Sequence, residues 1–134
     1  MNDCIFCKIV AGQIPAYRVW ENDDFIAFLD IKPVVEGHAL IIPREHHDYV
    51  FDLPENLYQG LFAAARTLAP AFKRATNCKK VAISIVGVDV PHTHLHLIPV
   101  TLPGDTDHSR AHEVSKEDLR EIQDKLISEI KKEA

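Results

Sequence analysis

The sequence lacks the features that would direct it to a membrane, to export or to nucleic acid. No apolar run approaches the ~20 residues that span a bilayer. The opening MNDCIFCKIVAG has neither the basic start nor the long apolar stretch of a signal peptide. The 15 Lys and Arg are outnumbered by 20 Asp and Glu, whereas a phosphate backbone needs a basic face. We therefore expect a cytoplasmic protein that binds neither membrane nor nucleic acid.

Cysteine is scarce, with 3 residues in the chain. Cys4 and Cys7 form a Cys-x-x-Cys pair, which in a cytoplasmic protein indicates a metal-binding or redox pair before a structural disulfide. A thioredoxin-like pair would lie between a strand and a helix of a βαβ unit, and none is evident. Two reduced thiols are the plain alternative. Cys78 is expected to be a further free thiol.

Internal repeats, low-complexity tracts and linkers are absent as well. A length of 134 residues suggests a single domain over residues 1–134. Apolar residues make up 46% and charged residues 26%, which is typical of a globular domain that buries its own core.

Segments that alternate or are rich in branched residues predict five strands. Residues 16–20 and 25–30 flank the polar turn ENDD and favour a hairpin. Residues 38–43, 80–86 and 92–100 predict the remaining strands. Strands and helices do not alternate regularly, so we expect an α+β protein with an antiparallel sheet and helices on one face.

Two segments have the spacing of amphipathic helices. The first follows start signals near Pro54, and Pro70 within it is expected to kink or shorten it. Its apolar positions are Leu57, Leu61, Ala65, Leu68 and Phe72. Residues 101–114 are polar and predict a loop. Ser115 and Asp118 resemble a capping box, which begins a last helix at about residues 115–132.

Three histidines alternate in VPHTHLHLIPV, residues 90–100. On a strand His92, His94 and His96 would share one face, with the outer Cα atoms about 13 Å apart. That distance disfavours a single metal centre of three histidines. A row of imidazoles on an open surface suits an elongated anionic ligand, with the central ring reacting and its neighbours donating hydrogen bonds. Solvated histidines on the wet face of a sheet are the alternative.

HTHLHLIP matches the His-x-His-x-His signature of the histidine triad (HIT) superfamily. The segment CIFCKIVAGQIPAYRVWENDDFIAFLDIKPVVEGHALIIPREH also resembles the Hint-branch nucleotide-binding hydrolases of bacteria. The resemblance covers about residues 4–100, the expected core. It implies a HIT-like fold, a five-stranded antiparallel sheet with a long central helix and a C-terminal helix.

The same resemblance implies a site for a purine nucleoside monophosphate, with no organic cofactor. His94 corresponds to the histidine that attacks the α-phosphorus and forms a nucleotidyl-histidine, which water then hydrolyses. Imidazole suits this role, because much of it is neutral at pH 7 and it is a competent nucleophile. His96 and His38 would bond the phosphate or hold the neighbouring rings. Without the resemblance, His38 would be read as a residue that merely begins a strand.

The implied nucleoside pocket places a carboxylate against the ribose hydroxyls and apolar groups around the base. Asp30 matches the ribose-binding acid. The apolar positions are Phe6, Ile9, Phe28 and Ile31, and for Ile9 and Phe28 plain core packing is an equal alternative. Ser84 is the polar residue nearest to a position where the family has asparagine.

Some bacterial proteins of this kind bind a structural zinc. The matching residues are Cys4, Cys7, His46 and His92, although His47 could replace His46. Two cysteines and two histidines form a closed tetrahedral set, which fits a structural role. Such a site would remove His92 from direct catalysis.

The chain departs from the family beside the phosphate. Val88 stands where glutamine is usual, and Asp89 where serine is frequent. Both positions line the leaving-group side, and a protonated Asp89 could act as general acid. We expect a purine nucleoside phosphoramidate or nucleotidyl hydrolase. The alternatives are a non-enzymatic nucleotide-binding protein, a dinucleoside polyphosphate hydrolase and, least favoured, a metal-dependent hydrolase.

The resemblance also implies a homodimer in which two sheets join into one of ten strands. Residues 63–65 and 69 are alanines, which would let two long helices approach closely at a two-fold axis. Residues 80–86 form an apolar strand that should not remain a bare edge.

Overall fold

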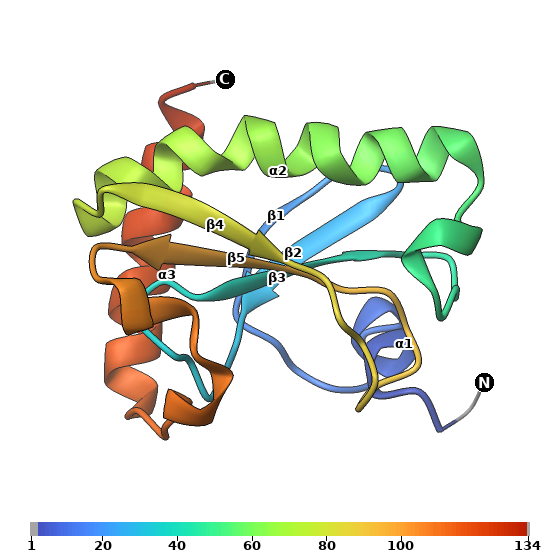
Figure 1. Cartoon of the computed structure of the whole chain (residues 1–134), viewed down its shortest axis with the longest axis horizontal. Helices are drawn as coiled ribbons and strands as arrows, with labels where there is room; N and C mark the ends of the chain where they lie inside the picture. Colours follow the sequence, from blue (N-terminus) through green and yellow to red (C-terminus); the bar gives the residue numbers. More distant parts are fainter. Residues whose placement is uncertain (1–2, 134) are drawn as a thin grey trace.

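A computed structural model describes residues 3–133. One antiparallel sheet organises them, in the strand order β1-β2-β3-β5-β4 (Figure 1). The strands are β1 (Arg18–Glu21), β2 (Phe25–Leu29), β3 (Ala39–Pro43), β4 (Lys80–Ser84) and β5 (Leu95–Val100). The predicted five-stranded antiparallel α+β fold is confirmed.

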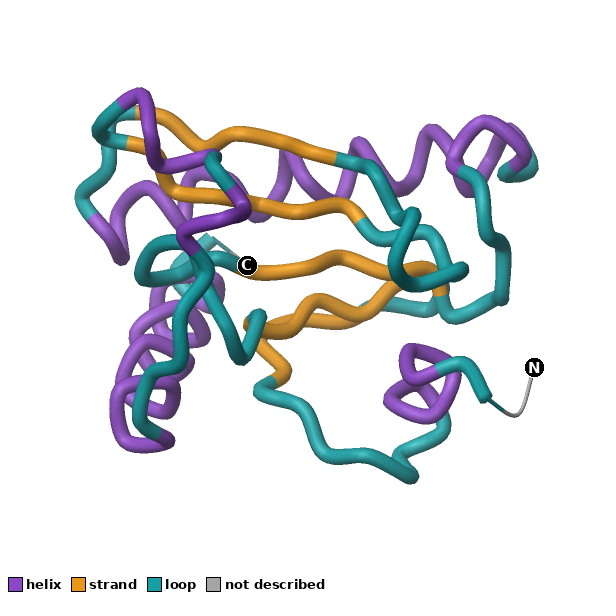
Figure 2. The backbone as a smooth tube through the Cα atoms, turned by 60° about the horizontal axis from the view of Figure 1, so that its bottom comes forward, coloured by secondary structure: helices purple, strands orange, loops and turns teal. Residues whose placement is uncertain are grey.

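The two faces of the sheet are covered by different helices. Both α2 (Glu55–Thr76) and α3 (Lys116–Lys131) pack on one face, and α1 (Ile5–Val10) packs on the other (Figures 1 and 2). The central strands β2 and β3 are buried throughout, because alternate side chains enter two separate apolar clusters. The two predicted helices therefore share one face, as expected, and α1 on the other face was not predicted. A six-residue helix is too short to show an apolar period in the sequence.

Pro70 does not shorten the long helix, which continues to Thr76. Proline has no backbone N–H to donate to the carbonyl one turn earlier, so the helix loses that hydrogen bond. Pro70 is exposed, whereas Leu68, Ala71 and Phe72 around it are buried in the core. Packing of the inner face keeps the helix continuous. The helix ends at Asn77, which takes the left-handed conformation with φ 56°.

The fifth strand begins at Leu95, three residues later than predicted. The backbone before it bonds to other loops: the Thr93 N–H donates to the His47 carbonyl at 2.6 Å, and the His92 N–H donates to the Val90 carbonyl at 2.8 Å. Only His96 of the three histidines is a strand residue. The prediction of three imidazoles on one strand face is wrong for the first two.

Polar side chains shape the segment of residues 101–114. It contains two single turns, η2 (Pro103–Thr106) and η3 (His108–Arg110), and a further turn, η1 (Val50–Asp52), precedes α2. Ser115 caps α3 by accepting a hydrogen bond from the Asp118 N–H, so the predicted start of the last helix is confirmed. Across residues 3–133 no helix has the length and apolar character needed to cross a membrane.

Candidate active site and metal site

The triad histidines are enclosed by α1, not spread along an open surface. His92 and His94 are 0% and 3% exposed, and His96 is half-buried. Phe6 of α1 covers the first two rings, with centroid distances of 5.8 Å to His92 and 5.0 Å to His94. The expected open surface is therefore wrong, because the short helix that closes it was not predicted. Buried imidazoles have fixed partners, and these partners define the tautomers.

His94 keeps one ring nitrogen free for chemistry. Its Nδ1 lies 2.8 Å from the backbone carbonyl of His92. A carbonyl only accepts hydrogen bonds, so Nδ1 carries the proton of the neutral ring. The lone pair of Nε2 is then available to attack an electrophile. This is the arrangement that a histidine nucleophile requires.

His38 and His96 form a directed pair. The Val34 N–H donates to His38 Nδ1 at 3.1 Å, so the proton of the neutral His38 ring is on Nε2. That Nε2–H donates to His96 Nδ1 at 2.9 Å. The Nε2–H of neutral His96 remains as a donor for a ligand. The structure thus brings His38 next to His96, as expected for residues that hold a phosphate.

Burial keeps this pair uncharged. Desolvation lowers the pKa of His96 to about 3, and the nearby imidazoles of His38, His94 and His108 act in the same direction. Desolvation also lowers the pKa of His38, against the opposing effect of the Asp30 carboxylate. Both rings are neutral at physiological pH, so they can donate hydrogen bonds without repelling each other.

An apolar cavity of about 230 Å³ opens beside His94 and His96. Its walls include the predicted residues Phe6, Ile9, Phe28 and Ile31, and Asp30 and Asp89 lie at its polar side. The Asp30 carboxylate is held at the rim, because its Oδ1 accepts from the Lys32 N–H at 2.9 Å. Ser84 does not line this cavity; it lies on β4, opposite His96 in the strand register.

Sequence reasoning missed part of this cavity. Ile14, Pro15 and Ala16 line it, from the segment between α1 and β1. Leu40 lines it from β3. These positions contain only apolar residues in a loop and a buried strand, so no local pattern separates them from ordinary core residues.

A second, polar cavity of about 480 Å³ lies next to the first. Asp30, Asp89 and His96 line both cavities, and Lys32 and His108 line only the second of the two. Asp89 is exposed, and its Oδ1 accepts from the Val90 N–H at 3.1 Å. The carboxylate therefore lies at the junction of the cavities, not away from the site. His108 was not predicted, because it comes from the polar segment after the sheet.

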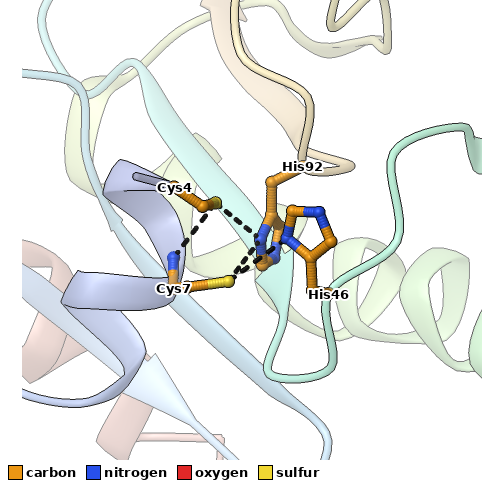
Figure 3. A group of neighbouring side chains, drawn as sticks. All are labelled: Cys4, Cys7, His46 and His92. Carbon is orange, nitrogen blue, oxygen red and sulfur yellow. Dashed lines mark hydrogen bonds between the residues drawn. The ribbon is translucent and has the colours of Figure 1, made fainter. Parts of the chain in front are cut away.

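Cys4, Cys7, His46 and His92 converge on one point (Figure 3). Their candidate ligand atoms all lie within 4.8 Å of one another. The Sγ atoms of Cys4 and Cys7 lie 3.3 and 3.5 Å from His92 Nδ1, and Cys7 Sγ lies 3.2 Å from His46 Nδ1. His47 is directed elsewhere, with its Nε2 3.2 Å from a Glu45 oxygen. The geometry selects His46 over His47.

The tautomer of His92 fits a metal ligand. Its Nε2 lies 2.8 Å from the Pro43 carbonyl and must donate, so the lone pair of Nδ1 faces the two sulfurs. A metal-binding histidine is ordinarily oriented by such a hydrogen bond from its other nitrogen. Two sulfurs and two imidazole nitrogens form a soft, four-ligand set of the kind that holds structural zinc.

A second group with metal-like spacing does not fit a metal. Asp30, His38 and His96 also have candidate ligand atoms within 4.8 Å of one another. The Val34 N–H occupies Nδ1 of His38, so Nε2 keeps its proton and has no lone pair for an ion. Within this group His38 and His96 are hydrogen-bonded, and the Asp30 carboxylate lies 3.8 Å from His38 Nε2.

Comparison with known proteins identifies the family of this chain. The HIT domain family profile matches residues 11–101. An adenosine 5′-monophosphoramidase of Saccharomyces cerevisiae is 42% identical over 97 residues, which cover 72% of this chain and 61% of that protein. An adenylylsulfatase of Arabidopsis thaliana is 31% identical over 103 residues, covering 73% and 52%. The chain thus spans less than two thirds of either relative.

A solved structure is similar over almost the whole chain. It is the crystal structure of a zinc-bound histidine triad family protein from Mycobacterium smegmatis, with a TM-score of 0.84 and 28% identity. The similarity covers 98% of this chain and 95% of that one. The chain belongs to the HIT family, as the triad motif indicated.

Proposed function

We propose that this protein hydrolyses purine nucleoside 5′-phosphoramidates through a covalent nucleotidyl-histidine at His94 and releases the nucleoside monophosphate. The observation that carries the proposal is the free Nε2 of His94, whose side chain lines the apolar cavity beside His96. His96, Asp30 and Asp89 connect this cavity to the second one. The two relatives named as a phosphoramidase and an adenylylsulfatase support a nucleotide hydrolase.

Each part of the site has one task in this reaction. The apolar cavity holds the base, and Asp30 accepts hydrogen bonds from the ribose hydroxyls. His94 Nε2 attacks the α-phosphorus; the P–N bond breaks, and the amine leaves with its electron pair and takes up a proton from solvent. His96 donates a hydrogen bond from its Nε2–H to the phosphoryl group, and His38 holds the His96 ring in place. Water then attacks the phosphorus and releases a proton to solvent, and His94 regains the electron pair of the N–P bond.

One assay tests the proposal. The protein is incubated with adenosine 5′-phosphoramidate, and AMP is measured by chromatography against a protein-free blank. We expect AMP to accumulate over many turnovers. AMP binding by calorimetry without turnover would favour the alternative, a nucleotide-binding protein that has lost catalysis beside Val88 and Asp89.

Asp89 is expected to set a preference between departing groups. Its exposed carboxylate places a negative charge beside the junction of the two cavities, which disfavours an anionic departing nucleotide and favours an amine that becomes cationic. Charge interactions at exposed sites reach ~1 kcal/mol, a factor of about five, and we expect Asp89→Ser to shift the preference toward a dinucleoside polyphosphate by about that factor. The measurement is the ratio of kcat/KM for a phosphoramidate and for diadenosine polyphosphate. Asp89→Asn removes the charge at nearly constant size, and a ratio within twofold of the parent in both variants would disprove the idea.

We also infer that Cys4, Cys7, His46 and His92 hold a structural zinc ion. The convergence of the four side chains and the zinc-bound relative of M. smegmatis support this. The ion would join α1 to the loop after β3 and to the first triad histidine, and it would leave His92 out of the reaction. None of the three cysteines is in a disulfide, which suits the reducing cytoplasm, where we place the protein.

We propose a homodimer built on the β4 edge of the sheet. β4 has a partner strand only on the β5 side, and Ile83 on it is 47% exposed. Of the alanines expected at the interface, Ala64 and Ala65 are buried in the core, so only residues 63 and 69 are available on α2. Sedimentation at micromolar concentration should give twice the chain mass, and Ile83→Lys should halve it. A single-chain mass for the parent protein would refute the dimer.

A further inference from the structure

His108 adds an imidazole to the site from outside the sheet. Its ring lies 4.7 Å from the His96 ring at an interplanar angle of 78°, and 6.0 Å from the His38 ring at 81°. The side chain is exposed on its outer side. His108 therefore covers the rings of His38 and His96, which we assign to phosphate binding. The outer side of the His108 ring stays accessible to a ligand.

Hydrogen bonds hold His108 in this position. Directly after β5, the Asp105 carboxylate accepts from the N–H groups of Leu102 and Thr101, and these bonds lower its pKa. Asp107 then accepts from the N–H and hydroxyl of Ser109. These contacts fold residues 101–110 into two turns attached to the strand that carries His96.

The other end of the segment is attached to the loop beside Asp30. The His112 N–H donates to the Pro33 carbonyl at 3.2 Å. The segment that carries His108 is thus held at one end directly after β5 and at the other end by the loop that follows β2 and Asp30.

A ligand in the polar cavity would contact His108, which lines it. A nucleotide whose base fills the apolar cavity and whose phosphorus meets His94 must direct its departing group across Asp89 and His96. The space on that side is the cavity lined by Lys32, Asp89 and His108. The amine that leaves therefore lies against the His108 ring. This step rests on the proposed function.

We propose that His108 is a specificity-determining residue that packs on the departing amine and favours amines that carry a flat ring. Imidazole is a planar aromatic surface, and aromatic pairs are more favourable than their contact area alone predicts. Ammonia is too small to contact His108 from the phosphorus. The structure therefore assigns to His108 a preference for bulky amines. A substrate that releases ammonia would not show this preference.

Two substrates with the same AMP half and the same P–N bond test this inference. One is adenosine 5′-phosphoramidate, and the other carries benzylamine on the phosphorus. We expect His108→Ala to lower kcat/KM for the benzylamide by about fivefold, the size of an aromatic contact, and to leave the phosphoramidate within twofold. His108→Phe should restore most of the loss. Glu113→Ala, in the same segment and outside both cavities, should change neither substrate.

Binding separates this inference from the proposed function. In a His94→Ala background, calorimetry should show that His108→Ala weakens the benzylamide by about the same factor and leaves AMP unchanged. That result supports the inference even if the parent protein cleaves neither substrate, in which case the proposed hydrolysis alone fails. An equal loss for both substrates would mean that His108 acts only through His96, and no change for either would mean no contact. Both results would overturn the inference.

Discussion

Replacing His94 with alanine is expected to lower the rate of AMP release by at least about a thousandfold, because no other group supplies the covalent step. AMP binding should weaken by less than about tenfold, since Asp30 and the apolar cavity hold the nucleoside. Single-turnover kinetics with adenosine 5′-phosphoramidate measures the first effect, and calorimetry with AMP measures the second.

A matched substitution separates chemistry from folding. His94 is buried beside Phe6, so alanine leaves a void there, and thermal unfolding of the variant has to be recorded with its activity. Glu113→Ala is the control, because this side chain is exposed and lines neither cavity. Turnover retained by His94→Ala above a tenth of the parent rate would rule out the nucleotidyl-histidine.

The strands were predictable because each has a local signature. β2 and β3 are apolar, begin or end at turn residues, and need no knowledge of the rest of the chain. The start of β5 was not predictable in this way. Residues 92–94 have the composition of a strand, but their backbone bonds to Val90 and His47, which only the folded chain brings near.

The candidate site likewise has residues that the sequence identifies and features that only the folded chain creates. Side chains in a motif, such as Cys4 with Cys7 or His94 with His96, could be picked out from spacing. Their protonation states depend on groups that have no signature: the Val34 N–H and the Pro43 carbonyl are backbone atoms. His108 reaches the site through turns formed by aspartates, and the sequence marks these only as polar.

Removal of the metal is expected to lower the melting temperature by about 10 °C or more. A ligand that binds only the folded state at a hundredfold or greater excess over its Kd contributes ~3 kcal/mol, and each kcal/mol shifts the midpoint of a domain of this size by about 3–5 °C. A bound ion would join α1 to the loop after β3 and to the triad segment, so its removal should also weaken AMP binding through Phe6 and Ile9. Protein purified without chelator is measured with and without EDTA, for zinc by elemental analysis and for unfolding by calorimetry.

Two neighbouring histidines make the test specific. His46→Ala should lose the zinc and the stability that EDTA removes, because His46 Nδ1 faces Cys7 Sγ at 3.2 Å. His47→Ala should keep both, since its ring pairs with Glu45 and only its backbone carbonyl holds Thr93. Cys7→Ser should behave like His46→Ala, and Cys78→Ala like the parent in zinc content. Less than about a tenth of a zinc ion per chain, with equal melting temperatures in EDTA and buffer, would show that the four side chains pack together without a metal.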